Sequence, residues 1–85
     1  MAEAIFDYEG NKNIIQCDIN NKMKDIINNL LIKIQNKENN LYYLYNGTKI
    51  NYELTFNQQA KDIDKNRKKM NIIVNQNEDA QNIIK

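Results

Sequence analysis

Residues 41–50, Leu-Tyr-Tyr-Leu-Tyr-Asn-Gly-Thr-Lys-Ile, constrain the fold more than any other part of this 85-residue chain. The large apolar and aromatic residues that begin the stretch suit a pleated, largely buried surface. Asn46-Gly47 follows them, and Asn-Gly supplies the positive φ angles that a tight hairpin turn needs. The sequence therefore predicts a central strand, a sharp turn and a short strand that leaves the turn.

Alternation of apolar and polar residues predicts further strands at residues 4–8, 14–19 and 70–74. A polar turn over residues 9–13 joins the first two strands into a hairpin. The side chains expected to face the core are Ala4, Phe6, Tyr8, Ile15, Cys17, Ile19, Met70, Ile72 and Val74. Ile5, Ile14 and Ile73 then point toward the opposite face of the sheet.

Residues 22–36 are expected to form an amphipathic helix, with Asn20-Asn21 as its N-cap. Apolar residues at spacings of three and four make one stripe along this helix. The stripe consists of Met23, Ile26, Ile27, Leu30, Leu31 and Ile34. A stripe of this length is enough to cover one face of a small sheet. Residues 57–64 are expected to form a short turn or helical loop that Ala60 and Ile63 seal against the core.

Composition excludes several classes of function. Twelve basic and eleven acidic residues leave a net charge of +1, so no overall field favours nucleic acid or a membrane. No apolar run approaches the roughly 20 residues that span a bilayer, and the N-terminus does not resemble a signal peptide. A single cysteine, Cys17, fits a reducing compartment. We therefore expect a cytoplasmic domain. The abundant Asn and Ile with no Pro are typical of an AT-rich genome and favour a protist source.

The residues that most catalytic sites need are missing. The chain has no His, and its two glycines are too far apart to form a phosphate-binding loop. Cys17 is predicted to lie in the core as an inert thiol. Asp62 and Asp64 are expected to be solvated charges in a lysine-rich loop. The sequence predicts no enzymatic activity, no cofactor, no metal site and no small-molecule substrate.

The order of elements, a hairpin, a helix, a strand, an Asn-Gly turn, a short strand, a loop and a final strand, is typical of the β-grasp fold. This is an α+β class, with a mixed sheet of four to five strands wrapped on one helix. The sequence resembles ubiquitin-like domains over about residues 4–75. The segments that carry the resemblance are residues 34–38, 43–50, 54–56 and 70–74.

The resemblance implies a protein-binding patch on the exposed face of the sheet. By position, Leu44 matches the family's patch isoleucine and Ile73 its patch valine, whereas the third patch residue has no counterpart. Asn71 stands where the family has histidine, and Tyr42 where it has arginine. With Lys49, these four residues form the predicted contact set for an unidentified protein partner. A strand register shifted by one residue would instead place Leu44 inside.

The family's conjugating members end in a di-glycine tail, which residues 82–85 of this sequence do not match. The resemblance therefore implies a non-conjugated domain at residues 1–75, followed by a polar tail or linker at 76–85, within a larger protein. One alternative is a structural building block, held in an assembly by its edges and by a tail that ends in Ile83-Ile84. Another is nucleic-acid binding through the basic run Lys65, Arg67, Lys68 and Lys69, which we expect to be a solvated charge run instead.

Overall fold

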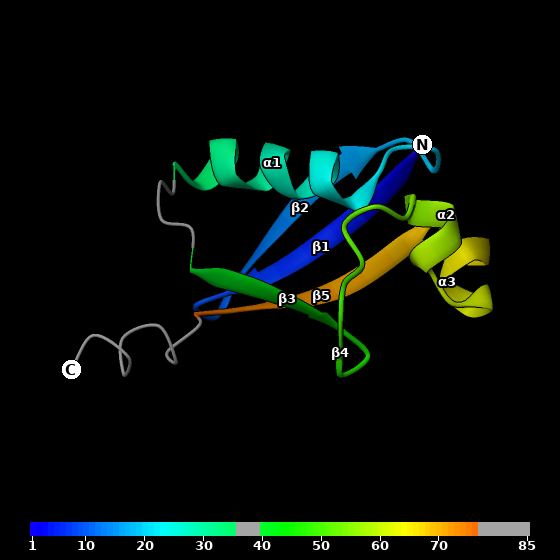
Figure 1. The fold of residues 1–85 in the computed structure, drawn as a ribbon. Helices are drawn as coiled ribbons and strands as arrows, with labels where there is room; N and C mark the ends of the chain where they lie inside the picture. Colours follow the sequence, from blue (N-terminus) through cyan, green and yellow to red (C-terminus); the bar gives the residue numbers. More distant parts are fainter. Residues whose placement is uncertain (36–39, 77–85) are drawn as a thin grey trace.

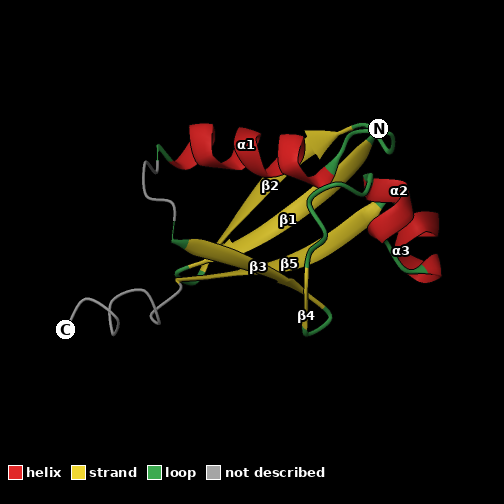
Figure 2. Cartoon of the chain, viewed as in Figure 1, coloured by secondary structure: helices red, strands yellow, loops and turns green. Residues whose placement is uncertain are grey.

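The structure, a computed structural model, describes residues 1–35 and 40–76 and has an α+β fold. A long helix lies across one face of a mixed sheet, and two short helices lie at one end of it (Figures 1 and 2). The elements, in chain order, are β1 (Ala2–Tyr8), β2 (Asn11–Cys17), α1 (Met23–Ile34), β3 (Leu41–Tyr45), β4 (Thr48–Lys49), α2 (Phe56–Gln59), α3 (Asp62–Arg67) and β5 (Lys69–Gln76).

The five strands of the sheet are arranged in the order β2-β1-β5-β3-β4. β1 is antiparallel to β2 and parallel to β5, and β5 is antiparallel to β3. The first and last strands of the chain therefore pair at the centre of the sheet, and α1 crosses from the β1–β2 hairpin to β3. This is the β-grasp arrangement expected from the sequence.

The core lies between the sheet and α1, as the alternation of residues predicted. Every inward residue expected on β1, β2 and β5 is buried or partly buried, and so is every residue of the helical stripe. The side chains under 2% exposed and largest in volume are Phe6, Phe56, Met23, Ile26, Leu30, Met70 and Ile72. β3 adds Tyr43 and Tyr45 to this core, and the ring of Tyr43 packs edge-on against Phe6 with centroids 6.2 Å apart.

Two tight turns fix the hairpins. Asn46 and Gly47 have φ angles of 51° and 80°, which confirms the predicted turn between β3 and β4. Glu9 and Gly10 have φ angles of 53° and 82° and form a second turn of the same kind between β1 and β2. The predicted turn at residues 9–13 was therefore too long, because β2 already begins at Asn11.

The predicted N-cap of α1 is wrong. The N-cap is Lys22, which makes no side-chain cap, and the Asn21 side chain instead accepts a hydrogen bond from the Asp18 amide at 2.8 Å. The first amides of α1 are satisfied from a distant loop. The Met23 amide donates to the Leu54 carbonyl at 2.8 Å, and the Lys24 amide donates to the Tyr52 carbonyl at 3.1 Å. A capping pattern in the neighbouring sequence cannot reveal partners that come from a distant part of the chain.

Residues 56–67 form two short helices. Thr55 caps α2 by accepting from the Gln58 amide, while the Gln58 side chain accepts from the Thr55 amide. Ala60 is buried as predicted. Ile63 is 70% exposed, so its predicted role in sealing the loop is wrong. In α3 the residue that faces the core is Asp64, one position further along the chain.

The expectation that Asp64 is a solvated charge is also wrong. Its side chain accepts a hydrogen bond from the Tyr45 hydroxyl and a second from the Arg67 guanidinium at 3.0 Å. The Tyr45 oxygen in turn accepts from the Lys61 amide at 2.9 Å. Asp62 does remain exposed, 3.9 Å from the Lys65 ammonium. Burial of Asp64 is tolerated because both of its oxygens have donors.

Some expectations fall outside the described residues. These are the helix end at residue 36 and the tail from residue 77 onward with Ile83 and Ile84. β5 ends at Gln76, one residue beyond the expected limit of the domain.

Candidate protein-binding face

The face of the sheet that points away from α1 carries the predicted contact residues; we call it the outer face. Leu44 of β3 and Ile73 of β5 are directly opposite each other in the antiparallel register. Ile73 is 53% exposed and Leu44 is partly exposed. Their neighbours Tyr43 and Tyr45 are only 5% and 4% exposed, so the alternative register that would bury Leu44 is wrong.

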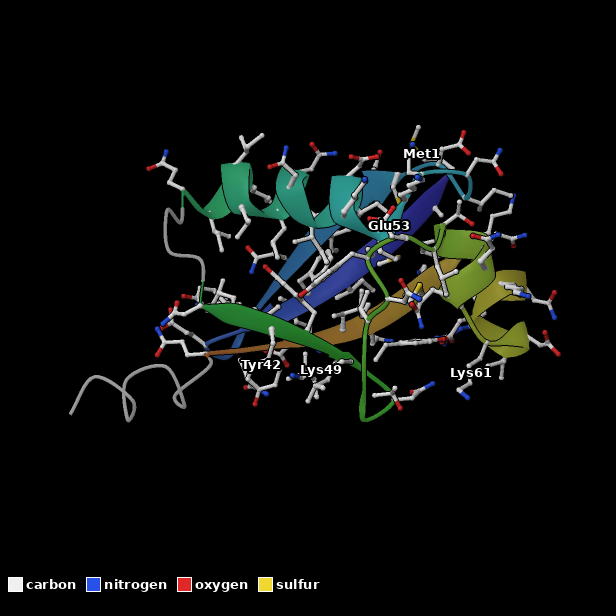
Figure 3. The ribbon with its side chains drawn as sticks, in the orientation of Figure 1. Met1, Tyr42, Lys49, Glu53 and Lys61 are labelled. Atoms are coloured by element: carbon white, nitrogen blue, oxygen red, sulfur yellow. The ribbon has the colours of Figure 1, made fainter. Side chains whose placement is uncertain are left out.

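The other three predicted contact residues lie on the same face. Lys49 of β4 is opposite Leu44, and its ammonium nitrogen lies 5.5 Å from the centroid of the Tyr42 ring. Figure 3 shows the Tyr42 and Lys49 side chains together on the side of the sheet away from α1. Asn71 is exposed on β5, two residues before Ile73. The structure therefore brings all five residues onto one surface.

Two further apolar residues extend this surface. Ile5 of β1 and Ile14 of β2 are opposite each other, and both point to the outer face as the sequence predicted. Ile14 is 47% exposed and Ile5 is partly exposed. On its other side, Ile5 is opposite Asn71 of β5.

The carboxylates of the outer face are paired with lysines. The Asp7 carboxylate lies 3.9 Å from the Lys12 ammonium, and the Glu3 carboxylate lies 4.0 Å from the Lys69 ammonium. Exposed pairs of this kind contribute at most about 1 kcal/mol to stability. Each of the two pairs joins one positive and one negative charge, so the surface beside Ile73 and Ile5 gains no net charge from them. Sequence reasoning missed these pairs because each joins two strands whose register is set by the fold.

The basic run at residues 65–69 is largely neutralised. Three of its cations lie within ion-pair distance of a carboxylate: Lys65 with Asp62, Arg67 with Asp64 at 3.0 Å, and Lys69 with Glu3. A surface that binds phosphates by releasing counterions needs unpaired cations. The arrangement therefore gives little support to nucleic-acid binding through this run.

Within residues 1–35 and 40–76, no group of three or more His, Cys, Asp or Glu side chains could hold a metal ion. Cys17 is buried, and burial, with a smaller contribution from the nearby Asp18 charge, raises the pKa of its thiol from 9.0 to about 11. A thiol with this pKa is protonated at neutral pH and is a poor nucleophile. Among the described helices, none is long and apolar enough to cross a membrane.

Comparison with known proteins shows similarity of fold alone. No protein-family model matches the sequence, and no curated protein matches it. Among solved structures, the chain is similar to one described as the crystal structure of ATBAG1 in complex with HSP70, with a TM-score of 0.72 and 10% sequence identity. The match covers 99% of this chain and 45% of that chain, so this chain spans less than half the length of that protein.

Proposed function

We propose that this domain is a non-catalytic protein-interaction domain of ubiquitin-like, non-conjugating type, which docks through the outer face of its sheet. The observation that carries the proposal is the opposed pair Leu44 and Ile73, two aliphatic side chains on the face that α1 leaves uncovered. Single exposed aliphatic residues are ordinary on protein surfaces. Adjacent ones on a sheet face, rimmed by polar groups, are typical of a contact site.

The surroundings of this pair support a protein partner. Tyr42, Lys49 and Asn71 provide an aromatic ring, a cation and an amide next to the apolar pair, which resembles the apolar centre and polar rim of protein interfaces. The similar structure is that of a protein bound to another protein. Because the match spans less than half of ATBAG1, its complex with HSP70 supports protein binding in general and does not name the partner.

An assembly held by the edges of the sheet has weaker support. β2 forms one edge, and the Lys33 ammonium donates to the Ile14 carbonyl at 3.1 Å. A lysine that covers an edge carbonyl obstructs pairing with another strand. The tail that would serve such an assembly lies outside the described residues.

The proposal is tested by affinity capture with three matched baits: the wild type, Ile73→Lys and Ile32→Lys. Ile32 is 67% exposed and lies on α1, across the sheet from the outer face, so the control introduces the same charge at a similarly exposed isoleucine. We expect Ile73→Lys, and likewise Leu44→Lys, to lose specific partners at least tenfold, as hot-spot changes do. Ile32→Lys should retain them.

Circular dichroism and thermal melting should show all variants to be folded, because the substituted residues are at least partly exposed. Partners retained equally by Ile73→Lys and Leu44→Lys would contradict docking through the outer face.

A further inference from the structure

The turn between β3 and β4 contains Asn46-Gly47, the one Asn-Gly pair in the sequence. Asparagine is a thermolabile residue, because the backbone nitrogen of the next residue can attack its side-chain carbonyl carbon. Every other asparagine is followed by a residue whose side chain hinders that nitrogen, whereas glycine has no Cβ. A Cβ added at Gly47 would meet no atom within 4 Å, so the space around this residue is open. Asn46 is therefore the asparagine whose neighbour hinders the attack least.

The folded turn keeps the two reacting groups apart. The φ angles of 51° and 80° at Asn46 and Gly47, between the paired residues Tyr45 and Thr48, define a two-residue type I′ turn. In such a turn the first residue has a ψ angle of about +30°, which places the Gly47 nitrogen nearly opposite the Asn46 Cβ about the Cα–C′ bond. The attack closes a five-membered ring, and this ring needs the same two atoms nearly eclipsed. The turn must therefore open before the reaction can occur.

Opening of this turn leaves the core in place. Residues 46–49 are all exposed, between the buried side chains of Tyr45 and Ile50. β4 is two residues long and lies at the edge of the sheet. Its release breaks the pairs Tyr45–Thr48 and Leu44–Lys49 and the contact of Lys49 with the Tyr42 ring. Segments with few buried contacts open locally, at a free energy below that of global unfolding.

The reaction requires water and no other reagent. In the opened turn the Gly47 nitrogen loses its proton and bonds to Asn46 Cγ, and the side-chain amide nitrogen leaves as ammonia. Water then opens the succinimide ring. Attack at Cγ gives aspartate, whereas attack at C′ gives isoaspartate, whose main chain runs through Cβ and Cγ. Either product carries a carboxyl group in place of the amide, which raises the mass by about 1 Da and involves no oxidation or reduction.

We propose that Asn46 is a site of spontaneous deamidation controlled by local opening of β4, and that isoaspartate at this position removes the β3–β4 hairpin. Isoaspartate adds one atom to the main chain of the turn, so the two residue pairs of β3 and β4 lose their register. Lys49 then leaves the Tyr42 ring, and a new carboxylate lies three residues before it. The modification alters the outer face at two of its predicted contact residues. The inference goes beyond the proposed function and does not depend on it.

The test is incubation of the folded chain at mildly alkaline pH, with the modified residues located by peptide mass spectrometry. We expect conversion at Asn46 to be at least tenfold faster than at Asn51, which is also exposed but is followed by Tyr52. Conversion should be slower in the folded chain than in the urea-denatured chain, because the type I′ turn separates the reacting groups. Asn46→Asp prevents the reaction and provides the aspartate form for comparison.

Matched variants identify the route of opening. Thr48→Gly removes a β-branched residue from β4 and should speed conversion about fivefold by weakening the strand. Lys12→Gly introduces glycine at an exposed residue of β2, the other edge strand, and should leave the rate at Asn46 unchanged. Urea below the unfolding transition should also leave the rate unchanged, since local opening exposes little new surface.

Each part of the inference can be contradicted separately. Conversion at Asn46 no faster than at Asn51 would overturn the site. A rate that rises with urea in parallel with global unfolding, or that Thr48→Gly leaves unchanged, would overturn control by local opening. In the isoaspartate form, the NMR signals of the Lys49 methylene groups should move to their unfolded positions, while Asn46→Asp should keep the shifts caused by the Tyr42 ring. An isoaspartate form that keeps those shifts would overturn loss of the hairpin.

Discussion

The hydroxyl of Tyr45 donates a hydrogen bond to the buried carboxylate of Asp64, which is 19 residues away in the sequence. This bond links the end of β3 to α3. The same hydroxyl accepts from the Lys61 amide at 2.9 Å, and Arg67 holds the second carboxylate oxygen at 3.0 Å. The loop between β4 and β5 is therefore positioned by a polar network and by the apolar contacts of Phe56 and Ala60.

Tyr45→Phe should destabilise the domain by about 1–3 kcal/mol, because it leaves a buried carboxylate oxygen and a backbone amide without partners. Chemical denaturation followed by far-UV circular dichroism measures the change. Tyr42→Phe is the matched control, since Tyr42 is partly exposed on the outer face, and it should change the free energy of unfolding by no more than about 0.5 kcal/mol. Equal effects of the two substitutions would show that the network adds nothing to stability.

Gly47→Ala should cost about 1–2 kcal/mol in stability. Gly47 has a φ of 80°, which disfavours any residue with a Cβ, while a Cβ added there would meet no atom within 4 Å. The penalty is therefore conformational and not steric. Asn46→Gly, at the neighbouring positive φ of 51°, should be nearly neutral by the same measurement. A tolerated Gly47→Ala would mean that the turn between β3 and β4 adopts another conformation.

Cys17 should make stability depend on alkaline pH. Burial, and less strongly the Asp18 charge, raise the pKa of its thiol from 9.0 in the unfolded chain to about 11 in the folded protein. The neutral thiol is therefore favoured in the folded state. Its contribution is fully present below about pH 9 and is lost as the pH rises toward 11, by an amount on the order of 2 kcal/mol.

The measurement is urea denaturation of the wild type and Cys17→Ala at several pH values, in the presence of a reducing agent. The stability advantage of the wild type should be constant from pH 7 to 8.5 and should shrink above pH 9. A difference that stays the same up to pH 11 would contradict a raised pKa for Cys17.

The strands of the sheet and the buried face of α1 could be predicted because the sequence patterns that indicate them are local. Alternation along β1 and β5 and the helical spacing from Met23 onward each report which side chains are buried, and a short stretch of sequence is enough to show it. The same alternation placed Ile73 on the outer face, whereas Leu44 was assigned to that face from the resemblance to ubiquitin-like domains. The turn at Asn46-Gly47 was predictable because its positive φ angles restrict which residue types can form it.

The features that sequence reasoning missed depend on partners far along the chain. Asp64 is buried because Tyr45 reaches it from β3, and α1 begins at Met23 because the Leu54 carbonyl accepts its first amide. Ile63 was expected to seal the loop because of its spacing from Ala60, yet Asp64 is the buried residue of α3. No local pattern reports contacts of this kind.

The most direct test of docking through the outer face is a titration of the protein, labelled with ¹³C in its isoleucine methyl groups, with a purified partner obtained by affinity capture. The chain carries its own controls, because Ile73 and Ile14 lie on the outer face while Ile32 and Ile63 are exposed on α1 and α3. We expect the Ile73 methyl signal to shift on binding and the Ile32 and Ile63 signals to stay in place. Shifts of Ile32 or Ile63 with an unchanged Ile73 would contradict the account.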